Sequence, residues 1–170
     1  DFMAPPPSFF VLTTSTSEGY GYLFRLLCDP GDEILVAQPS YPLFDFLADL
    51  EDVRLQPYPL FYDHGWWIDF AELEKRIGPR TRAIVLVHPN NPTGHTTTRE
   101  QRWMLEELCE RNGLALIVDE VFLDYPLKSE PLETAELTNR LQKDSKYPLI
   151  FAADFERGLS MRLNGATAFP

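Results

Sequence analysis

Short apolar runs alternate with longer amphipathic stretches along most of this chain. The runs have the length and the β-branched and aromatic content of strands, and the amphipathic stretches place apolar residues at helical spacing. The predicted strands span residues 9–14, 33–38, 53–60, 82–88 and 114–120. The predicted helices span residues 15–28, the second part of 39–52, 69–77 and 98–113. Beyond residue 120 the pattern weakens, and we expect one more helix at 135–144 and one more strand at 147–154.

The order of these elements defines the expected fold class. Strands and helices alternate, and the runs at 82–88 and 114–120 are almost entirely apolar, as in strands buried on both faces. Prolines within 53–60 favour an edge position for that strand. We therefore expect a three-layer α/β/α architecture around a mainly parallel sheet, formed by residues 1–170 as a single domain. Ligands of such sheets bind at the carboxyl ends of the strands.

The charge balance and the composition narrow the classes of partner. The 170 residues include 15 basic and 26 acidic side chains, which gives a net charge of −11. Because nucleic acids and anionic membranes require a basic surface, neither is an expected partner, although backbone N–H groups can still hold a small anion. No apolar run is long enough to span a membrane, and no secretory leader is recognisable. Cys28 and Cys109 resemble buried hydrophobes more than a disulfide or a metal pair, so we expect a cytoplasmic protein.

Hydroxyl and aromatic side chains follow the first two predicted strands. Ser15, Thr16 and Ser17 lie where the first helix begins. They can cap that helix, which is the commoner role of such residues, or they can help its free N–H groups to hold a phosphate. Tyr41 lies between two prolines, and this stiff backbone either packs the ring into the loop or presents it to a planar ligand. The residues alone leave both pairs of alternatives open.

Polar residues also follow the strands predicted at 82–88 and 114–120. The segment 88–94, His-Pro-Asn-Asn-Pro-Thr-Gly, combines two prolines with two asparagines, which a tight turn and a ligand site would explain equally well. Asp119 ends a strand of hydrocarbon character, so its carboxylate needs a partner in the next turn or in a basic group. The three histidines are scattered without the spacing of metal ligands, and no metal site is predicted.

Four motifs together resemble the landmarks of one enzyme family. They are Thr-Ser-Thr-Ser-Glu-Gly at 14–19, Pro-Ser-Tyr-Pro at 39–42, Asn-Asn-Pro-Thr-Gly at 90–94 and Val-Asp-Glu-Val-Phe at 118–122. Their order and spacing resemble the large domain of the fold-type I pyridoxal-phosphate-dependent aminotransferases, the class I/II or aspartate aminotransferase superfamily. The likeness covers roughly residues 9–125, with a weaker continuation to about residue 163. It implies pyridoxal 5′-phosphate as cofactor, amino-group transfer between an amino acid and a 2-oxo acid, and a homodimer.

The resemblance also implies roles for individual residues. The hydroxyl residues 15–17 match the helix start that binds the cofactor phosphate, and Tyr41 matches the aromatic ring that stacks on the pyridine ring. Asn91 matches the asparagine that forms a hydrogen bond with the phenolic oxygen of the cofactor. Asp119 matches the carboxylate that pairs with the ring nitrogen and keeps it protonated. A protonated ring draws off the negative charge left when the substrate loses its α-proton.

Two positions depart from the family pattern. Phe122 stands where the family usually has a tyrosine that also reaches the phenolic oxygen, so the cofactor should be tuned differently but still bound. Arg157 stands at the position of the lysine that forms a Schiff base with the cofactor and moves the α-proton. Arginine stays protonated and cannot form an imine. Lys143 and Lys146 lie nearby, but in a polar run typical of solvated surface.

Part of the family's chain has no expected match in this sequence. Family members are more than twice this length, and the small domain that carries the substrate-binding arginine is expected to be absent. Arg162 is expected to match a second phosphate-binding arginine. The sequence therefore predicts an aminotransferase, or its large-domain portion, that binds the cofactor. The alternative is a non-catalytic or engineered fragment of that fold with a structural or binding role, and Arg157 favours this alternative. We expect such a chain to bind the cofactor weakly and non-covalently and not to transaminate.

Overall fold

A six-stranded sheet forms the centre of the computed structural model, which describes residues 10–123 and 151–152. Within these ranges the strand order is β3-β2-β1-β4-β5-β6. The strands are β1 (Glu33–Gln38), β2 (Arg54–Tyr62), β3 (Trp66–Ile68), β4 (Thr81–Val87), β5 (Ala115–Asp119) and β6 (Phe151–Ala152). Every neighbouring pair is parallel except β2 with β3, so the expected mainly parallel sheet is confirmed.

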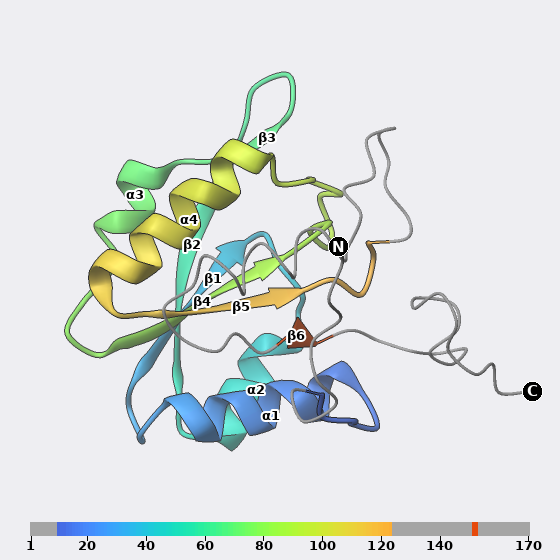
Figure 1. Ribbon diagram of the computed structural model, residues 1–170, viewed down its shortest axis with the longest axis vertical. Coiled ribbons are helices and arrows are strands. Elements are labelled where there is room, and N and C mark those ends of the chain that lie inside the picture. Colours follow the sequence, from blue (N-terminus) through green and yellow to red (C-terminus); the bar gives the residue numbers. More distant parts are fainter. Residues whose placement is uncertain (1–9, 124–150, 153–170) are drawn as a thin grey trace, which may run out of the picture.

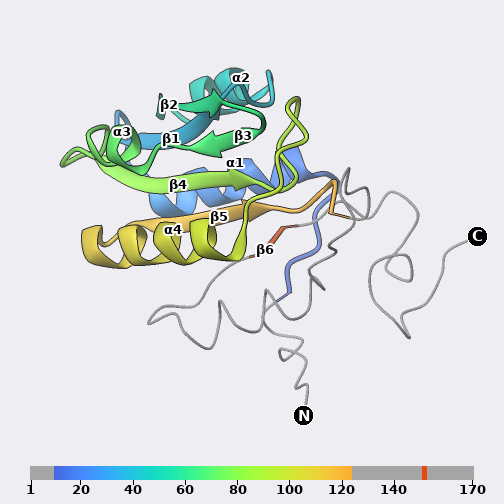
Figure 2. The ribbon, with the colours of Figure 1, turned by 90° about the horizontal axis from the view of Figure 1, so that it is seen from above.

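Helices cover both faces of this sheet. One face carries α1 (Thr16–Leu27) and α2 (Phe44–Leu50), and the other carries α3 (Phe70–Glu74) and α4 (Arg99–Asn112), as Figures 1 and 2 show. The expected three-layer α/β/α architecture is therefore confirmed. No helix within the described ranges is both long and apolar enough to cross a membrane.

The core consists of two apolar clusters, one on each face of the sheet. Alternate side chains of a strand point to opposite faces, so Leu35 of β1 packs in the same cluster as Leu105 of α4. Its neighbour Ile34 packs in the other cluster with Phe24 of α1. Six of the seven residues of β4 are buried, which confirms that this central strand is covered on both faces.

Local sequence signals set the ends of the helices. The hydroxyl of Ser15 accepts a hydrogen bond from the N–H of Glu18 and caps α1, as expected of a serine at this position. Thr98 and Gln101 form a complete capping box at the start of α4. Gly113 ends that helix in the left-handed conformation, with φ of 66°, which a glycine adopts without steric cost. The predicted helices at 15–28 and 98–113 are thus confirmed.

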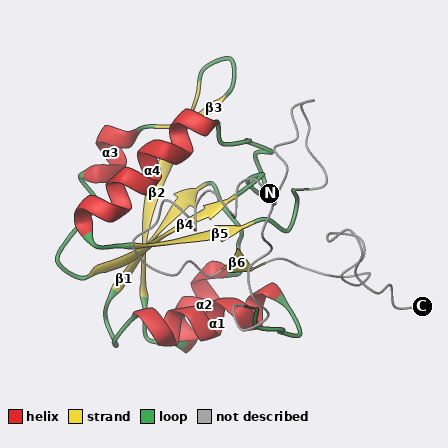
Figure 3. Ribbon diagram, viewed as in Figure 1, coloured by secondary structure: helices red, strands yellow, loops and turns green. Residues whose placement is uncertain are grey.

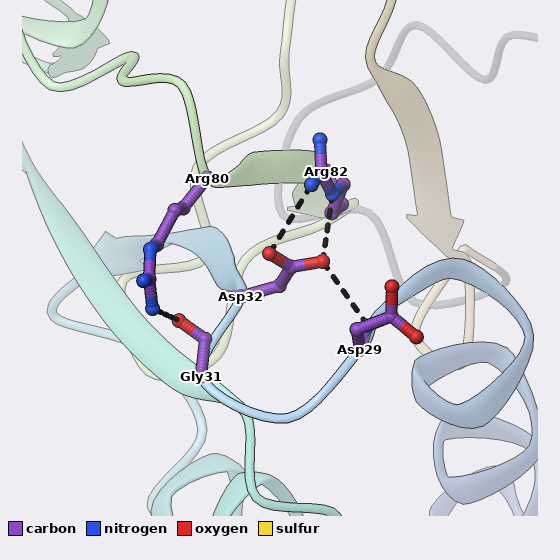
Figure 4. Close-up of polar contacts among 5 residues, drawn as sticks. All are labelled: Asp29, Gly31, Asp32, Arg80 and Arg82. Atoms are coloured by element: carbon purple, nitrogen blue, oxygen red, sulfur yellow. Dashed lines mark hydrogen bonds and ion pairs between the residues drawn. The ribbon is translucent and has the colours of Figure 1, made fainter.

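A charged cluster joins the amino ends of β1 and β4, at the end of the sheet where these strands begin (Figure 4). The buried carboxylate of Asp32 accepts two hydrogen bonds from Arg82, at 2.7 and 3.2 Å, and a third from the N–H of Asp29 at 3.0 Å. Arg80 donates to the carbonyl oxygen of Gly31 at 3.4 Å. The hydrogen bonds from Arg82, followed by the one from Asp29, lower the pKa of Asp32, so the carboxylate stays ionised against Arg82.

The strand predicted at 9–14 is wrong for the residues that the structure describes. Residues 10–14 form no strand, and Phe10, Val11 and Leu12 are 54%, 72% and 77% exposed. Residue 9 lies outside the described residues. The run has strand-like composition, but no neighbouring strand pairs with it in the described sheet, and pairing is what stabilises a strand.

The expectation of an edge position for residues 53–60 is confirmed for most of that segment, because residues 54–59 pair with β1 on one side and with no strand of the described sheet on the other. Only residues 60–62 of β2 pair on that side, with the short antiparallel strand β3, which the sequence pattern did not predict. The helix expected at 135–144 lies outside the described residues. Of the strand expected at 147–154, the structure describes β6, whose two residues pair with the end of β5. That residues 1–170 form one domain stays a prediction.

Candidate functional site

The loops that follow β1, β4 and β5 meet at the carboxyl ends of the strands, and α1 begins at the same end of the sheet (Figures 1 and 3). Hydrogen bonds connect these segments directly. The N–H of His88 donates to the backbone oxygen of Asp119 at 2.8 Å, which joins the ends of β4 and β5. The side-chain amide of Asn90 donates to the backbone oxygen of Pro39 at 3.1 Å, which joins the loops after β4 and β1. We call this end of the sheet the rim.

Asp119 is the acid at the centre of the rim. It ends β5 and is 6% exposed. Its Oδ2 accepts a hydrogen bond from the hydroxyl of Tyr20 in α1 at 2.7 Å, and its Oδ1 accepts one from the N–H of Val121 at 3.0 Å. The contact with Val121 is the cap on the next turn that the sequence allowed. The contact with Tyr20 could not be foreseen, because the two residues are 99 positions apart.

The two asparagines after β4 occupy different environments. Asn90 is buried and donates to both Pro39 and the hydroxyl of Thr93, so it holds the turn and the neighbouring loop together. Asn91, the residue expected to contact a ligand, is partly exposed. Sequence reasoning thus missed the structural role of Asn90, because two adjacent asparagines give no sign of which one turns inward. The peptide bonds that precede Pro39, Pro89 and Pro92 are cis.

His88 is a buried, neutral imidazole beneath this turn. Its Nδ1 accepts a hydrogen bond from the N–H of Thr97 at 3.1 Å, so the ring proton is on Nε2. Burial, and then the nearby charges of Arg102 and His95, lower the pKa of His88 to about 4. The ring therefore holds the chain at Thr97, where it runs from the turn toward α4. Because the ring is neutral, it adds no charge to the rim.

The start of α1 carries hydroxyls and also an acid. Ser15, Thr16 and Ser17 occupy the N-cap and the first two helical positions, where free N–H groups lie. Glu18, in the same turn, accepts hydrogen bonds from the backbone N–H and the hydroxyl of Thr14, at 2.6 and 2.9 Å. Chiefly the backbone hydrogen bond from Thr14 lowers the pKa of Glu18, so this helix start already holds one anion. Ser-x-x-Glu at 15–18 is a capping-box pattern, and that signal could have identified Glu18 from the sequence.

The remaining expected site residues divide into two groups. Tyr41 is partly exposed, and its ring meets Phe44 edge-on with the centroids 5.8 Å apart, so it packs the loop as the sequence allowed. Phe122 lies just beyond β5 and is 40% exposed. Arg157 and Arg162 lie outside the described residues. The structure therefore brings the ends of β4, β5 and α1 together, whereas the position of residue 157 relative to them stays a prediction.

The fold and the rim define a class of protein, the three-layer α/β domains that bind ligands at the carboxyl ends of a parallel sheet. Residues 6–151 match the family described as aminotransferase class I and II, and the chain belongs to this family. The sequence is 34% identical over 113 residues to an arginine–pyruvate transaminase of Pseudomonas aeruginosa, which is 66% of this chain and 29% of that protein. It is 31% identical over 120 residues to nicotianamine aminotransferase 1 of Oryza sativa subsp. japonica, 71% of this chain and 24% of the relative.

Solved structures show the same fold. The alanine aminotransferase from Pyrococcus furiosus superimposes with a TM-score of 0.62 at 32% identity, over 65% of this chain and 28% of its own. A pyridoxal-phosphate-bound C-S lyase from Staphylococcus hominis superimposes with a TM-score of 0.79 over 89% of this chain and 39% of its own, and at 23% identity this match shows the fold alone. The matched region thus spans about a quarter of the length of the two curated relatives.

Proposed function

We propose that this chain is the cofactor-binding large domain of a pyridoxal-phosphate-dependent aminotransferase and that it binds pyridoxal 5′-phosphate at the rim. The observation that carries the proposal is Asp119, a buried carboxylate at the end of a hydrocarbon-rich strand, held by two donors in a member of this family. Burying a carboxylate is costly, and a site that must pair with a cationic ring nitrogen gives a reason for it.

Polar atoms of the rim fit a polar ligand. Within the described residues the hydroxyl oxygen of Ser40 and the side-chain oxygen of Asn90 are buried without a hydrogen-bond partner, and both belong to rim loops. Unsatisfied buried oxygens of this kind are unusual in a folded protein, and a bound ligand or water can satisfy them. Glu18 fits less well, because its charge lies in the same turn that would receive the phosphate.

Each proposed contact rests on the match between a residue of this chain and a position of the family motifs. The free N–H groups and hydroxyls of residues 15–17 would hold the phosphate, and the ring of Tyr41 would stack on the pyridine ring. Asn91 would contact the phenolic oxygen, and Asp119 would keep a proton on the ring nitrogen. When bound, the cofactor supplies an electron sink for the charge left by the departing α-proton. Phe122 offers no hydrogen bond to the phenolic oxygen.

The sequence at residue 157 decides how far this chemistry can go. Arg157 at the expected lysine position can pair with a phosphate or a carboxylate but cannot bind the cofactor covalently. We propose that the chain binds the cofactor non-covalently and does not transaminate. The alternative is a non-catalytic member of the fold with a structural or binding role. An amino acid or a 2-oxo acid as substrate, a homodimer and a cytoplasmic location are part of the proposal.

The test combines affinity with covalent trapping. Titration of the protein with pyridoxal 5′-phosphate, followed by absorbance, should show saturable binding that Asp119→Asn weakens. Reduction with borohydride should leave the protein's intact mass unchanged. Arg157→Lys should then gain a borohydride-stable adduct that peptide mapping places at residue 157.

Three results would count against the proposal. Absence of saturable binding would refute cofactor binding. An adduct mapped to a lysine of the unmodified chain would refute the non-covalent claim. A folded Arg157→Lys variant that binds the cofactor without forming the adduct would show that position 157 does not face it. The matched control is Asp45→Asn, an exposed acid in the first turn of α2, which should leave binding unchanged.

A further inference from the structure

The hydroxyl of Tyr20 donates a hydrogen bond to Asp119, the acid on which the proposed function depends. Tyr20 lies in the second turn of α1 and is 3% exposed, and its oxygen is 2.7 Å from Oδ2 of Asp119. This contact links the helix whose first turn would hold the phosphate to the strand end whose acid would hold the ring nitrogen. Two ends of the same ligand would therefore be held by parts of the chain that are directly hydrogen-bonded to each other.

Packing alone does not explain a hydroxyl at this position. The ring of Tyr20 packs in the apolar cluster beneath α1 and α2, 5.8 Å from the ring of Phe24 and 5.0 Å from that of Phe44 between centroids. A phenylalanine would fill the same space without burying a polar group. Burying a hydroxyl costs free energy unless it is hydrogen-bonded, so the hydroxyl of Tyr20 is accounted for by its acceptor.

The protonation state of this pair is set by its surroundings. Burial, and then the negative charge and hydrogen bond of Asp119, raise the pKa of Tyr20 well above its ordinary value. The phenol therefore stays neutral at physiological pH and donates its proton to the carboxylate. Val121 donates to Oδ1 and Tyr20 to Oδ2, so donors from two different elements fix the plane of the carboxylate.

We propose that Tyr20 is a positioning residue that orients the carboxylate of Asp119 toward the ring nitrogen of the cofactor, an inference that rests on the proposed function. The physical basis is preorganisation: a carboxylate already held in its binding orientation loses less rotational freedom when the ligand arrives. Tyr20 acts through Asp119 and touches no reacting atom.

The experiment measures two affinities in three proteins. Pyridoxal 5′-phosphate reports on the ring-nitrogen contact and the phosphate contacts together, whereas inorganic phosphate reports on the phosphate contacts without the ring nitrogen. The variants are Tyr20→Phe and Tyr58→Phe. Tyr58 is the matched control, because it is fully buried and its hydroxyl donates to the backbone oxygen of Val85 at 3.2 Å, away from Asp119.

Tyr20→Phe should lose about tenfold in affinity for pyridoxal 5′-phosphate, the usual effect of deleting a hydrogen bond to a charged group, and keep its affinity for inorganic phosphate. Tyr58→Phe should keep both affinities. Equal losses in the two variants, or an unchanged affinity in Tyr20→Phe, would overturn the inference about Tyr20 and leave the proposed function standing. If the unmodified protein does not bind pyridoxal 5′-phosphate, the proposed function fails first, and the inference about Tyr20 fails with it.

A second measurement uses the unmodified protein and covers the case in which Tyr20→Phe does not fold. A buried hydroxyl proton on a short hydrogen bond exchanges slowly and is visible by proton NMR. The hydroxyl signal of Tyr20 should shift when pyridoxal 5′-phosphate is added and stay in place when inorganic phosphate is added. A signal that pyridoxal 5′-phosphate does not move at saturation would overturn the inference.

Discussion

Lowering the pH from 7.5 to 5 should destabilise the protein through His88, and His88→Asn should remove that part of the pH dependence. The imidazole is buried beneath the turn at 88–94, and its Nδ1 accepts a hydrogen bond from the N–H of Thr97. Protonating Nδ1 would abolish this acceptor and place a positive charge near Arg102. The folded state therefore binds a proton at His88 much less readily than the unfolded chain does.

The size of the effect follows from the two pKa values. Burial lowers the pKa of His88 from 6.5 to about 4 in the folded state. When the pKa of a base is lower in the folded state, the base contributes its full stabilisation above the pKa of the unfolded state. That stabilisation is lost as the pH falls toward the pKa of the folded state. Each pH unit in that window is worth about 1.4 kcal/mol. The loss between pH 7.5 and pH 5 is therefore about 2 kcal/mol, and it increases to about 3 kcal/mol at pH 4.

Urea unfolding at several pH values measures this directly. Asparagine at position 88 keeps an acceptor near the place of Nδ1 and does not titrate, so His88→Asn should have a pH-independent cost of about 1–3 kcal/mol for the lost ring volume. The unfolding free energy of the unmodified protein, relative to that of His88→Asn, should fall by about 2 kcal/mol from pH 7.5 to pH 5. Carboxylates titrate in both proteins and cancel. The control is His64→Asn, since His64 is exposed. A constant difference between His88→Asn and the unmodified protein would refute a neutral, buried ring.

Three further changes test other parts of the structure. Glu18→Gln should strengthen binding of inorganic phosphate about two- to fivefold by removing the acid from the first turn of α1, and calorimetry that shows no gain would place the anion elsewhere. Gly113→Ala should lower the unfolding free energy by about 1 kcal/mol, because φ of 66° is unfavourable for a residue with a Cβ. Gly113→Asn should lower it by less. Equal urea midpoints for the unmodified protein, Gly113→Ala and Gly113→Asn would contradict this prediction. Thr98→Ala should lower it by about 1 kcal/mol by removing the cap of α4, whereas Thr98→Ser should keep most of it.

The sequence predicted the elements whose own residues determine them. The strand at 33–38 was predicted with the bounds of β1, because a short continuous apolar run bounded by turns is typical of a buried strand. The helix predicted at 98–113 matches α4 and its two caps, because Thr98 and Gly113 act on the backbone of the helix ends themselves. Residues 10–14 have similar composition, yet they form no strand. Their own sequence could not show that the described sheet offers them no neighbouring strand.

Features that depend on distant partners could not be predicted from the sequence. The pairing of residues 60–62 of β2 depends on β3, a strand of three residues that is too short to give a periodic signal. In the site, Asp119 could be recognised as an acid that needs a partner, but the partner is the hydroxyl of Tyr20 on another element. Tyr20 occupies the apolar stripe of α1, where an aromatic residue is expected for packing alone.

β1 and β4 are fastened to each other at both ends. Asp32 and Arg82 join them where they begin, and the contact between Asn90 and Pro39 joins the loops that follow them. The spacing between these two strands is therefore fixed at both their amino ends and their carboxyl ends. Loop-exchange libraries that randomise residues 40–43 and 91–96 while keeping these four residues should retain the frame, so new ligand preferences could be selected on this scaffold without rebuilding its core.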